Sequence, residues 1–177
     1  EETSAAQHLR DARILPIYEG TNGIQARDLV GRKVAKDGGE TMLALVAEMR
    51  ATAQEMKTAP GDDLEAIRTG LVAAADALED ATQWVAQSVK AELVNALAGS
   101  VPFLRLAGTG LGGWLLARSA LVAQTRLGQR DGDPTFLEAK LVTARFYAEV
   151  ILPPALAQLG PLKAAGRTVF VLAEEQF

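Results

Sequence analysis

The sequence predicts an all-α protein, an antiparallel helical bundle of four to five helices preceded by a short helix-loop-helix remnant. Apolar residues recur every three or four positions along most of the 177 residues, which is the period of one helix face. No short β-branched run alternates with polar residues, so no strand is expected. Alanine occurs 32 times, and such small side chains let long helices approach one another closely.

The first two bundle helices are delimited by glycine and proline. Apolar positions from Met42 to Met56 predict one helix, which ends before Ala59-Pro60-Gly61. Asp62 or Asp63 is the expected N-cap of the next helix, because a carboxylate can accept a hydrogen bond from a first-turn N–H. An unbroken apolar stripe as far as Leu97 predicts an unusually long helix of about 35 residues, which is typical of bundles.

A third long helix is expected over about 101–127, since Gly99-Ser100 separates it from the second and Pro102 suits a first turn. After a polar loop, Pro134 should start a further helix that runs to Ile151.

Pro153-Pro154 then interrupts or kinks that helix. A shorter helix is expected after the prolines, from Leu162 or Thr168 to Glu175.

Composition excludes several function classes. The net charge is −4, and scattered Lys and Arg argue against nucleic-acid or polybasic membrane binding. The chain contains no cysteine, which rules out disulfides and zinc-thiolate sites. With one histidine, His8, no multi-histidine metal site is expected. The apolar run from Gly110 to Ala123 is too short and too interrupted to predict a membrane span.

Two further patterns are better explained by packing than by chemistry. Residues Gly108 to Gly113 match G-x-G-x-x-G, but that motif needs a strand before it, and Phe103 to Ala107 is helical in pattern. We therefore interpret these glycines as a place where two helix backbones cross closely. Arg145-Phe146-Tyr147 could form a stacking patch, although a core aromatic pair beside a surface arginine is the simpler interpretation.

The segment around Glu19 does not follow helical packing. Pro16 is expected to prevent a regular helix, and Gly20 and Gly23 permit backbone conformations that other residues avoid. A helix is expected to start near Asn22, next to Glu19. A carboxylate beside the free N–H groups of a helix N-terminus indicates either a binding or catalytic loop or a plain interhelical connection.

Residues 10–33, here called the signature segment, resemble the C-terminal signature of flavin-dependent acyl-CoA dehydrogenases. The resemblance rests on Arg10 to Ile14, on Ile17 to Gln25 and on Asp28 to Lys33. Phe103 to Leu106 and Lys140 to Ala148 are similar to the extra C-terminal helical domain of enlarged bacterial members, a group that includes enzymes resembling 3-methylmercaptopropionyl-CoA dehydrogenase.

The resemblance implies α,β-dehydrogenation of an acyl-CoA thioester. Glu19 matches the catalytic base that removes the α-proton, and Gly20 matches a substrate-binding position. The backbone N–H of Glu19 matches a donor to the thioester carbonyl. The residues that match FAD-binding positions are Thr21, Asn22, Gly23 and Gln25.

The resemblance also implies an organisation. Residues 1–38 match the end of the dehydrogenase helical domain, and 39–177 match an appended bundle. The opening residues read as the middle of a helix without an initiator Met, so a fragment is expected. We expect it to be inactive alone and to hold no stoichiometric FAD, although the resemblance implies that the full-length enzyme uses FAD, an acyl-CoA substrate and an electron-transfer acceptor.

The resemblance also implies a homo-oligomer. A cytoplasmic location is expected, because no signal peptide opens the chain. The alternative is a non-enzymatic helical module that mediates subunit contacts.

Overall fold

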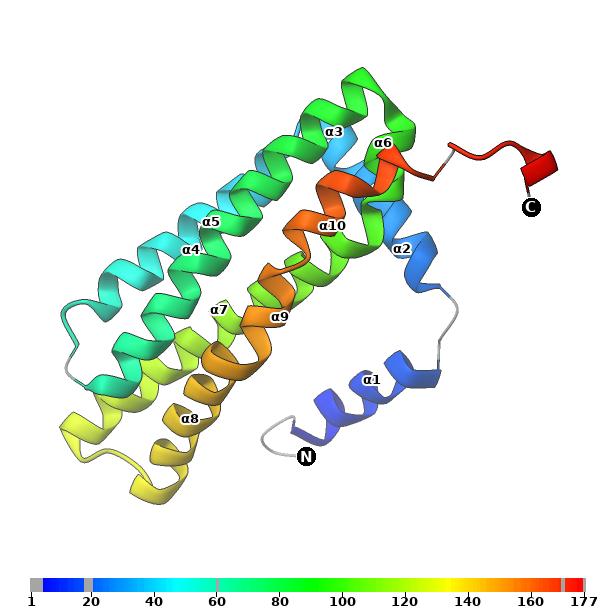
Figure 1. The fold of residues 1–177 in the computed structure, drawn as a ribbon. Helices are drawn as coiled ribbons and strands as arrows, with labels where there is room; N and C mark the ends of the chain where they lie inside the picture. The colour runs from blue at the N-terminus through cyan, green and yellow to red at the C-terminus, as the bar shows by residue number, and fades with distance from the viewer. Residues whose placement is uncertain (1–4, 18–20, 60, 170, 177) are drawn as a thin grey trace.

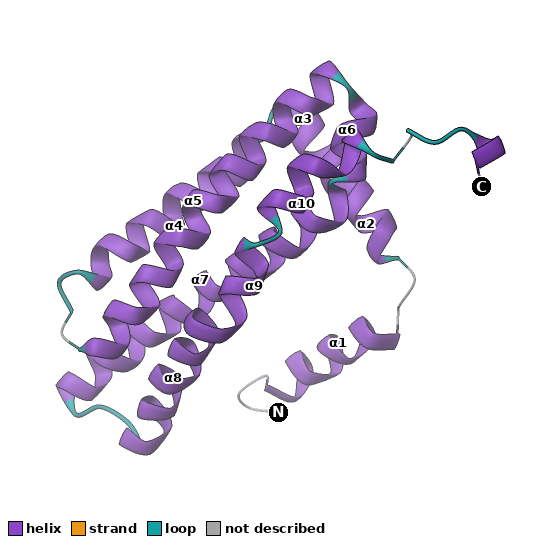
Figure 2. Ribbon diagram, in the orientation of Figure 1, coloured by secondary structure: helices purple, strands orange, loops and turns teal. Residues whose placement is uncertain are grey.

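The computed structural model describes residues 5–17, 21–59, 61–169 and 171–176, and every regular element among them is a helix (Figure 2). The predicted all-α class is therefore confirmed. In chain order the elements are α1 (Ala5–Ile17), α2 (Asn22–Asp28), η1 (Leu29–Val34), α3 (Ala35–Asp37), α4 (Glu40–Met56), α5 (Asp62–Ala91), α6 (Leu93–Ala98), α7 (Ser100–Gln129), α8 (Pro134–Phe146), η2 (Tyr147–Ile151), α9 (Leu152–Leu156), α10 (Leu159–Ala164), η3 (Ala165–Arg167) and η4 (Glu174–Gln176).

Four long helical stretches form an antiparallel bundle (Figure 1). Helix α4 packs along α5, α7 packs along α8, and α5 also contacts α7. The continuation of α8 through η2 and α9 closes the bundle against α5 and α7. Helix α1 stands apart from this bundle in Figure 1. The predicted bundle and the helix on each side of the Glu19 segment are both present.

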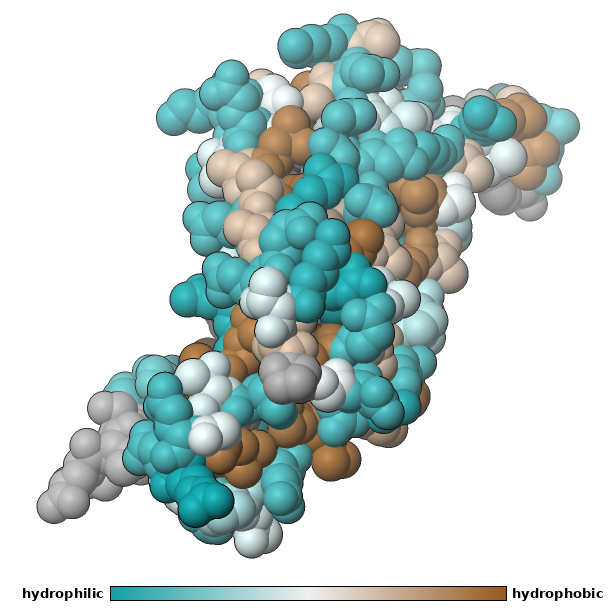
Figure 3. All heavy atoms as spheres, turned by 90° about the vertical axis from the view of Figure 1, so that its left-hand side faces the viewer, coloured by the Kyte–Doolittle hydropathy of each residue, from teal (hydrophilic) through white to brown (hydrophobic). Residues whose placement is uncertain are grey.

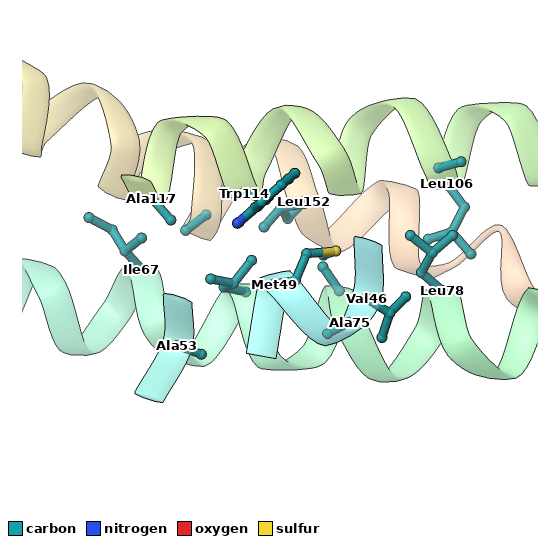
Figure 4. Packing of buried hydrophobic residues seen from close by; sticks show 14 of the residues in the cluster. Val46, Met49, Ala53, Ile67, Ala75, Leu78, Leu106, Trp114, Ala117 and Leu152 are labelled. Atoms are coloured by element: carbon teal, nitrogen blue, oxygen red, sulfur yellow. The ribbon is translucent and has the colours of Figure 1, made fainter. Parts of the chain in front are cut away.

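The core runs along the whole bundle and is aliphatic with few aromatic rings. Figure 4 shows Met49 from α4, Leu78 from α5 and Leu152 from α9 lying in the space between the helices. Phe103 of α7 is fully buried. The indole of Trp114 donates its N–H to Thr52 Oγ1 at 2.8 Å, so the polar atom of the large core aromatic is satisfied.

The predicted helix of about 35 residues is wrong in length, because it breaks at Glu92. Helix α5 ends at Ala91, and Glu92 is extended (φ −155°, ψ 93°) before α6 begins. The Glu92 carboxylate accepts a hydrogen bond from the Asn95 side chain at 2.6 Å. Asn95 also lies directly against Gly166, so close that a Cβ on that glycine would overlap it. The break lets α6 turn toward the C-terminal helices, a tertiary contact that periodicity does not report.

The N-cap prediction at Asp62 or Asp63 is also wrong. Gly61 occupies the cap position with φ 126°, a backbone conformation that residues other than glycine rarely adopt. Both aspartates lie in the first turn of α5 instead, where the helix dipole still favours their charge. Pro134, by contrast, is the first residue of α8 as predicted, with Asp133 as its cap through a 3.0 Å bond from the Thr135 N–H.

Of the four glycines from Gly108 to Gly113, Gly112 and Gly113 sit at a close helix crossing, as interpreted from the sequence, whereas a Cβ on Gly108 would meet nothing within 4 Å. A Cβ on Gly112 would lie 2.8 Å from the hydroxyl of Tyr147, and one on Gly113 would lie 3.2 Å from the Leu152 side chain. Tyr147 donates its hydroxyl to the Thr109 carbonyl at 3.0 Å across the same crossing. Burial raises the pKa of this phenol.

The core aromatic pair expected at Phe146 and Tyr147 is wrong for Phe146, which is exposed. Consecutive helix residues point to different sides, so only one of the two rings can face the core. Arg145 is held by Asp63 at 2.9 Å and by Glu149 at 3.1 Å.

Pro153 and Pro154 interrupt the last long helix without ending it. The preceding turn widens into the π-helix η2, in which the Leu152 N–H reaches the Tyr147 carbonyl. Proline has no N–H to donate to the carbonyl four residues earlier, and the wider π-turn accommodates the missing hydrogen bond. Beyond α9 the expected short helix is divided: α10 and η3 end at Arg167, and η4 is a separate turn at Glu174–Gln176.

On the face of the molecule that Figure 3 draws, apolar patches interrupt a mostly polar surface. Helix α7 is the one described helix whose length and apolar composition would let it cross a membrane. That is weak evidence, because a core helix meets the same criteria, and ten α7 residues are buried. The absence of a membrane span stays a prediction.

Candidate functional site

The predicted site residues fall at the junction between α1 and α2. Glu19 and Gly20, the predicted base and substrate-binding residues, lie outside the described residues. Helix α1 runs through Pro16 to Ile17, so the expectation that Pro16 prevents a helix is wrong. Proline's fixed φ is compatible with a helix, and in a last turn its missing N–H removes a single ladder bond.

The four predicted FAD contacts come together at the start of α2. Thr21 is the N-cap residue, and its carbonyl accepts the Gln25 N–H at 2.8 Å. The side chains of Asn22 and Gln25 are exposed, and a Cβ on Gly23 would meet nothing within 4 Å. These residues therefore present a hydroxyl, two amides and open backbone on one accessible helix start.

The same helix is anchored to the bundle by its opposite side. Ala26 and Val30 are fully buried and Val34 nearly so. Helix α2 contacts α7, and η1 contacts α5, α6 and α7. Val30 and Val34 belong to the same apolar cluster as the long helices. The bundle thus holds the helix whose free end carries Thr21 to Gln25.

A left-handed double-glycine turn follows this anchored helix. Gly38 and Gly39 have φ of 66° and 90°, which glycine adopts without steric cost. The Asp37 carboxylate accepts the N–H of Gly39 at 2.9 Å and that of Thr41 at 3.0 Å. Hydrogen bonds from Thr41 and then Gly39 hold the pKa of Asp37 below its usual value. The predicted domain boundary at residue 38 falls in this turn and stays a prediction.

A hollow of about 470 Å³ lies beside the anchored helix and was missed by sequence reasoning. Ile24, Gly31, Leu93 and Leu97 give it apolar walls, and Arg27 and Arg32 add guanidinium groups. Asp28 pairs with Arg32 at 3.0 Å. The spacing of Arg27 and Arg32 on one helix was visible in the sequence. The opposite wall was not, because Leu93 reaches this place only through the break at Glu92.

Acidic side chains elsewhere join helices of the bundle. Arg50 of α4 donates to Asp76 at 2.8 Å and to Glu79 at 2.6 Å on α5, and these hydrogen bonds raise the pKa of the guanidinium. Lys163 of α10 donates to Asp80 at 2.7 Å. Each of these pairs is partly exposed, which limits its contribution to stability. They are structural contacts between helices.

Fold and site together show an all-α bundle that buries one side of α2 and leaves the start of that helix accessible. Residues 45–173 match the family described as acetyl-CoA dehydrogenase C-terminal like. The chain belongs to the acyl-CoA dehydrogenase family and corresponds to its C-terminal portion.

Three relatives illustrate the similarity. The 3-methylmercaptopropionyl-CoA dehydrogenase of Ruegeria pomeroyi is 43% identical over 152 residues, 86% of this chain and 26% of that protein. A butyryl-CoA dehydrogenase of Syntrophomonas wolfei is 31% identical over the whole chain and 29% of its own length. A broad-specificity linear acyl-CoA dehydrogenase of Mycobacterium tuberculosis is 34% identical over 83% of this chain and 25% of its own. The chain therefore spans about a quarter of these curated relatives.

Proposed function

We propose that the chain is the C-terminal part of an FAD-dependent dehydrogenase that removes the α- and β-hydrogens of an acyl-CoA thioester. One observation carries the proposal. Of the residues that match the family's FAD-binding positions, Asn22, Gly23 and Gln25 are exposed and Thr21 is half-buried at the start of α2, while Ala26 and Val30 fix that helix to the bundle. The relatives that span the chain are named as acyl-CoA dehydrogenases.

The donor and acceptor groups at the start of α2 fit a flavin dinucleotide. Thr21, Asn22 and Gln25 offer hydroxyl and amide groups suited to its polar atoms, and Gly23 leaves room for close approach. When bound, FAD supplies the acceptor for the two electrons that leave the substrate. In the isolated chain we expect no stoichiometric FAD and no dehydrogenase activity.

Glu19 is proposed to take the α-proton as a general base. A carboxylate in water is a weak base, so exclusion of water around bound substrate must raise its pKa for the transfer. The backbone N–H of Glu19 donates to the thioester carbonyl and stabilises the negative charge that develops there. Gly20 lets the substrate lie close to the main chain.

Replacing Glu19 by Gln in the longer enzyme tests this role. Glutamine keeps the shape of the side chain but cannot accept the proton, so turnover should fall by about a hundredfold or more, with the visible flavin absorbance retained. Glu138→Gln, which changes an exposed carboxylate of α8, is the matched control and should leave turnover unchanged. Full turnover by the Glu19→Gln enzyme would contradict the proposed role.

We also propose that the bundle mediates contacts between copies in a homo-oligomer. The observation that favours this role is a set of large apolar side chains on α7 and α8 that remain exposed: Leu115, Val122 and Phe136.

A further inference from the structure

The hollow beside α2 combines an apolar wall with cationic side chains. Ile24 and Leu93 belong to the wall, and both are exposed. Arg27 and Arg32 line the same hollow together with one carboxylate, that of Asp28. A ligand that fits this hollow therefore needs apolar groups together with negative charge.

The single carboxylate does not balance the cations around it. Arg32 lies 3.0 Å and Lys33 lies 3.8 Å from the oxygens of Asp28, which is thus shared between two cations. The ion pairs formed among the described residues do not include Arg27. A second hollow, of about 510 Å³, shares Arg32 with the first and is lined by Lys33 and Lys36. The surface beside α2 therefore carries an excess of positive charge.

Residues 171–176, here called the C-terminal segment, have the complementary composition. Val171 and Leu172 are exposed, and Glu174 and Glu175 follow them in η4. Figure 1 shows this part of the chain leading away from the bundle next to α6. Apolar side chains followed by two carboxylates match the wall and the cations of the hollow.

The C-terminal segment also starts close to the hollow. The turn η3, which precedes it, contacts α6, the helix that supplies Leu93. Gly166 of η3 lies directly against Asn95 of α6. Helix α6 has six residues and is about 9 Å long, whereas the chain from Gly166 to Leu172 can span about 20 Å. The segment can therefore reach the hollow without any rearrangement of the bundle.

We propose that the hollow beside α2 is a binding site for the C-terminal segment of the same chain. In the bound state Leu172 packs against Leu93, and the carboxylates of Glu174 and Glu175 face Arg27. The bound segment braces α2, the helix that carries the predicted FAD contacts. A tethered segment has a local concentration on the order of millimolar, which favours it over a separate acidic peptide.

Engineered cysteines provide the test, because the chain has no cysteine of its own. Leu93 and Leu172 are 46% and 51% exposed, so replacing them leaves the core intact. Leu93→Cys combined with Leu172→Cys should form an intramolecular disulfide under mild oxidation, since that bond requires Cα atoms within about 7 Å of each other. Non-reducing electrophoresis and intact mass distinguish this product from disulfide-linked dimers.

A matched pair controls for chance encounters of the C-terminal segment with the bundle. Phe136→Cys replaces another exposed apolar residue, near the start of α8 and at the end of the bundle away from α6 (Figure 1). Combined with Leu172→Cys, it should cross-link at least about tenfold more slowly, because the tether does not favour that encounter. Equal rates for the two pairs overturn the inference.

Charge reversal tests the electrostatic part of the proposed contact. Replacing Glu174 and Glu175 by arginine in the Leu93→Cys, Leu172→Cys chain should slow cross-linking by about tenfold. Adding Arg27→Glu and Arg32→Glu to that variant should restore the rate. Lys140→Glu on α8 is the control and should leave the rate unchanged. Circular dichroism checks that each variant is folded, and a rate that does not respond to charge reversal contradicts the proposed contact.

Discussion

Large apolar side chains are buried in the bundle helices but exposed in helix α1. Helices α4, α5 and α7 bury apolar side chains along their full lengths. In α1, the large apolar side chains Leu9, Ile14 and Leu15 are all more than half exposed. The bundle therefore carries its own stabilising core, whereas the apolar residues of α1 find no covering surface among the described residues.

Helix α2 and its continuation stand between these two cases. One side is buried through Ala26 and Val30, and the other presents exposed Asn22, Gly23 and Gln25. Half of the signature segment is therefore structurally part of the bundle. Stability should consequently depend on position along the chain, which the following variants test.

The largest expected effect comes from the core. Phe103→Ala removes a fully buried ring and should lower the free energy of unfolding by about 3–5 kcal/mol, because transfer and cavity costs add. Leu9→Ala on α1 should change it by less than about 0.5 kcal/mol. Urea unfolding followed by circular dichroism measures both. Similar losses in the two variants would remove the contrast between bundle and α1.

A smaller effect is expected from paired glycine variants within the bundle. A Cβ on Gly99 would lie 2.7 Å from the Leu162 carbonyl oxygen, so Gly99→Ala forces a backbone shift and should cost about 1–3 kcal/mol. Gly108 has nothing within 4 Å of its Cβ position. Gly108→Ala should stabilise by about 0.5–1 kcal/mol, since alanine is the better helix former. Thermal unfolding shows whether each variant is stabilised or destabilised. A Gly99→Ala variant that is more stable than wild type would show that the start of α7 and α10 do not meet closely there.

The smallest effect concerns pH at the junction between α3 and α4. The folded-state pKa of Asp37 is lowered by its hydrogen bonds from Thr41 and Gly39. Its contribution to stability is therefore present above the unfolded pKa of about 3.9 and lost as pH falls through the folded value. Asp37→Ala should be less stable than wild type near neutral pH, and the gap should narrow in acid. Denaturation at a series of pH values checks this, and a gap that widens in acid would refute it.

Local periodicity predicted the long helices well where packing follows the repeat. The structure places α4 at Glu40–Met56, α7 at Ser100–Gln129 and the start of α8 at Pro134, close to the predicted bounds. Two of the errors share a cause. The break at Glu92 and the cap at Gly61 are governed by contacts from distant segments or by backbone conformation, and neither leaves a 3.6-residue repeat. Phe146 is exposed for a local reason, because consecutive helix residues point to different sides.

The candidate site also has features that the sequence predicted and features that only the structure revealed. The residue pattern around Glu19 was sufficient to predict the base and the FAD contacts from resemblance, and these roles stay predictions. That Ala26 and Val30 anchor α2, and that Ile24 and Leu93 share a hollow, could not be predicted, because both require the place of α6 and α7 in space.

The order of residues along the chain was enough to specify the helical class, the apolar stripes, the main helix boundaries and the membership of the acyl-CoA dehydrogenase family. These depend on local periodicity, proline and glycine signals and a continuous motif. Packing in three dimensions determined where α5 breaks, at which glycines two helices cross closely, and which apolar residues stay exposed to solvent. Those outcomes depend on contacts between residues far apart in the chain, such as Asn95 with Gly166 and Gly112 with Tyr147, whose energies no local pattern contains.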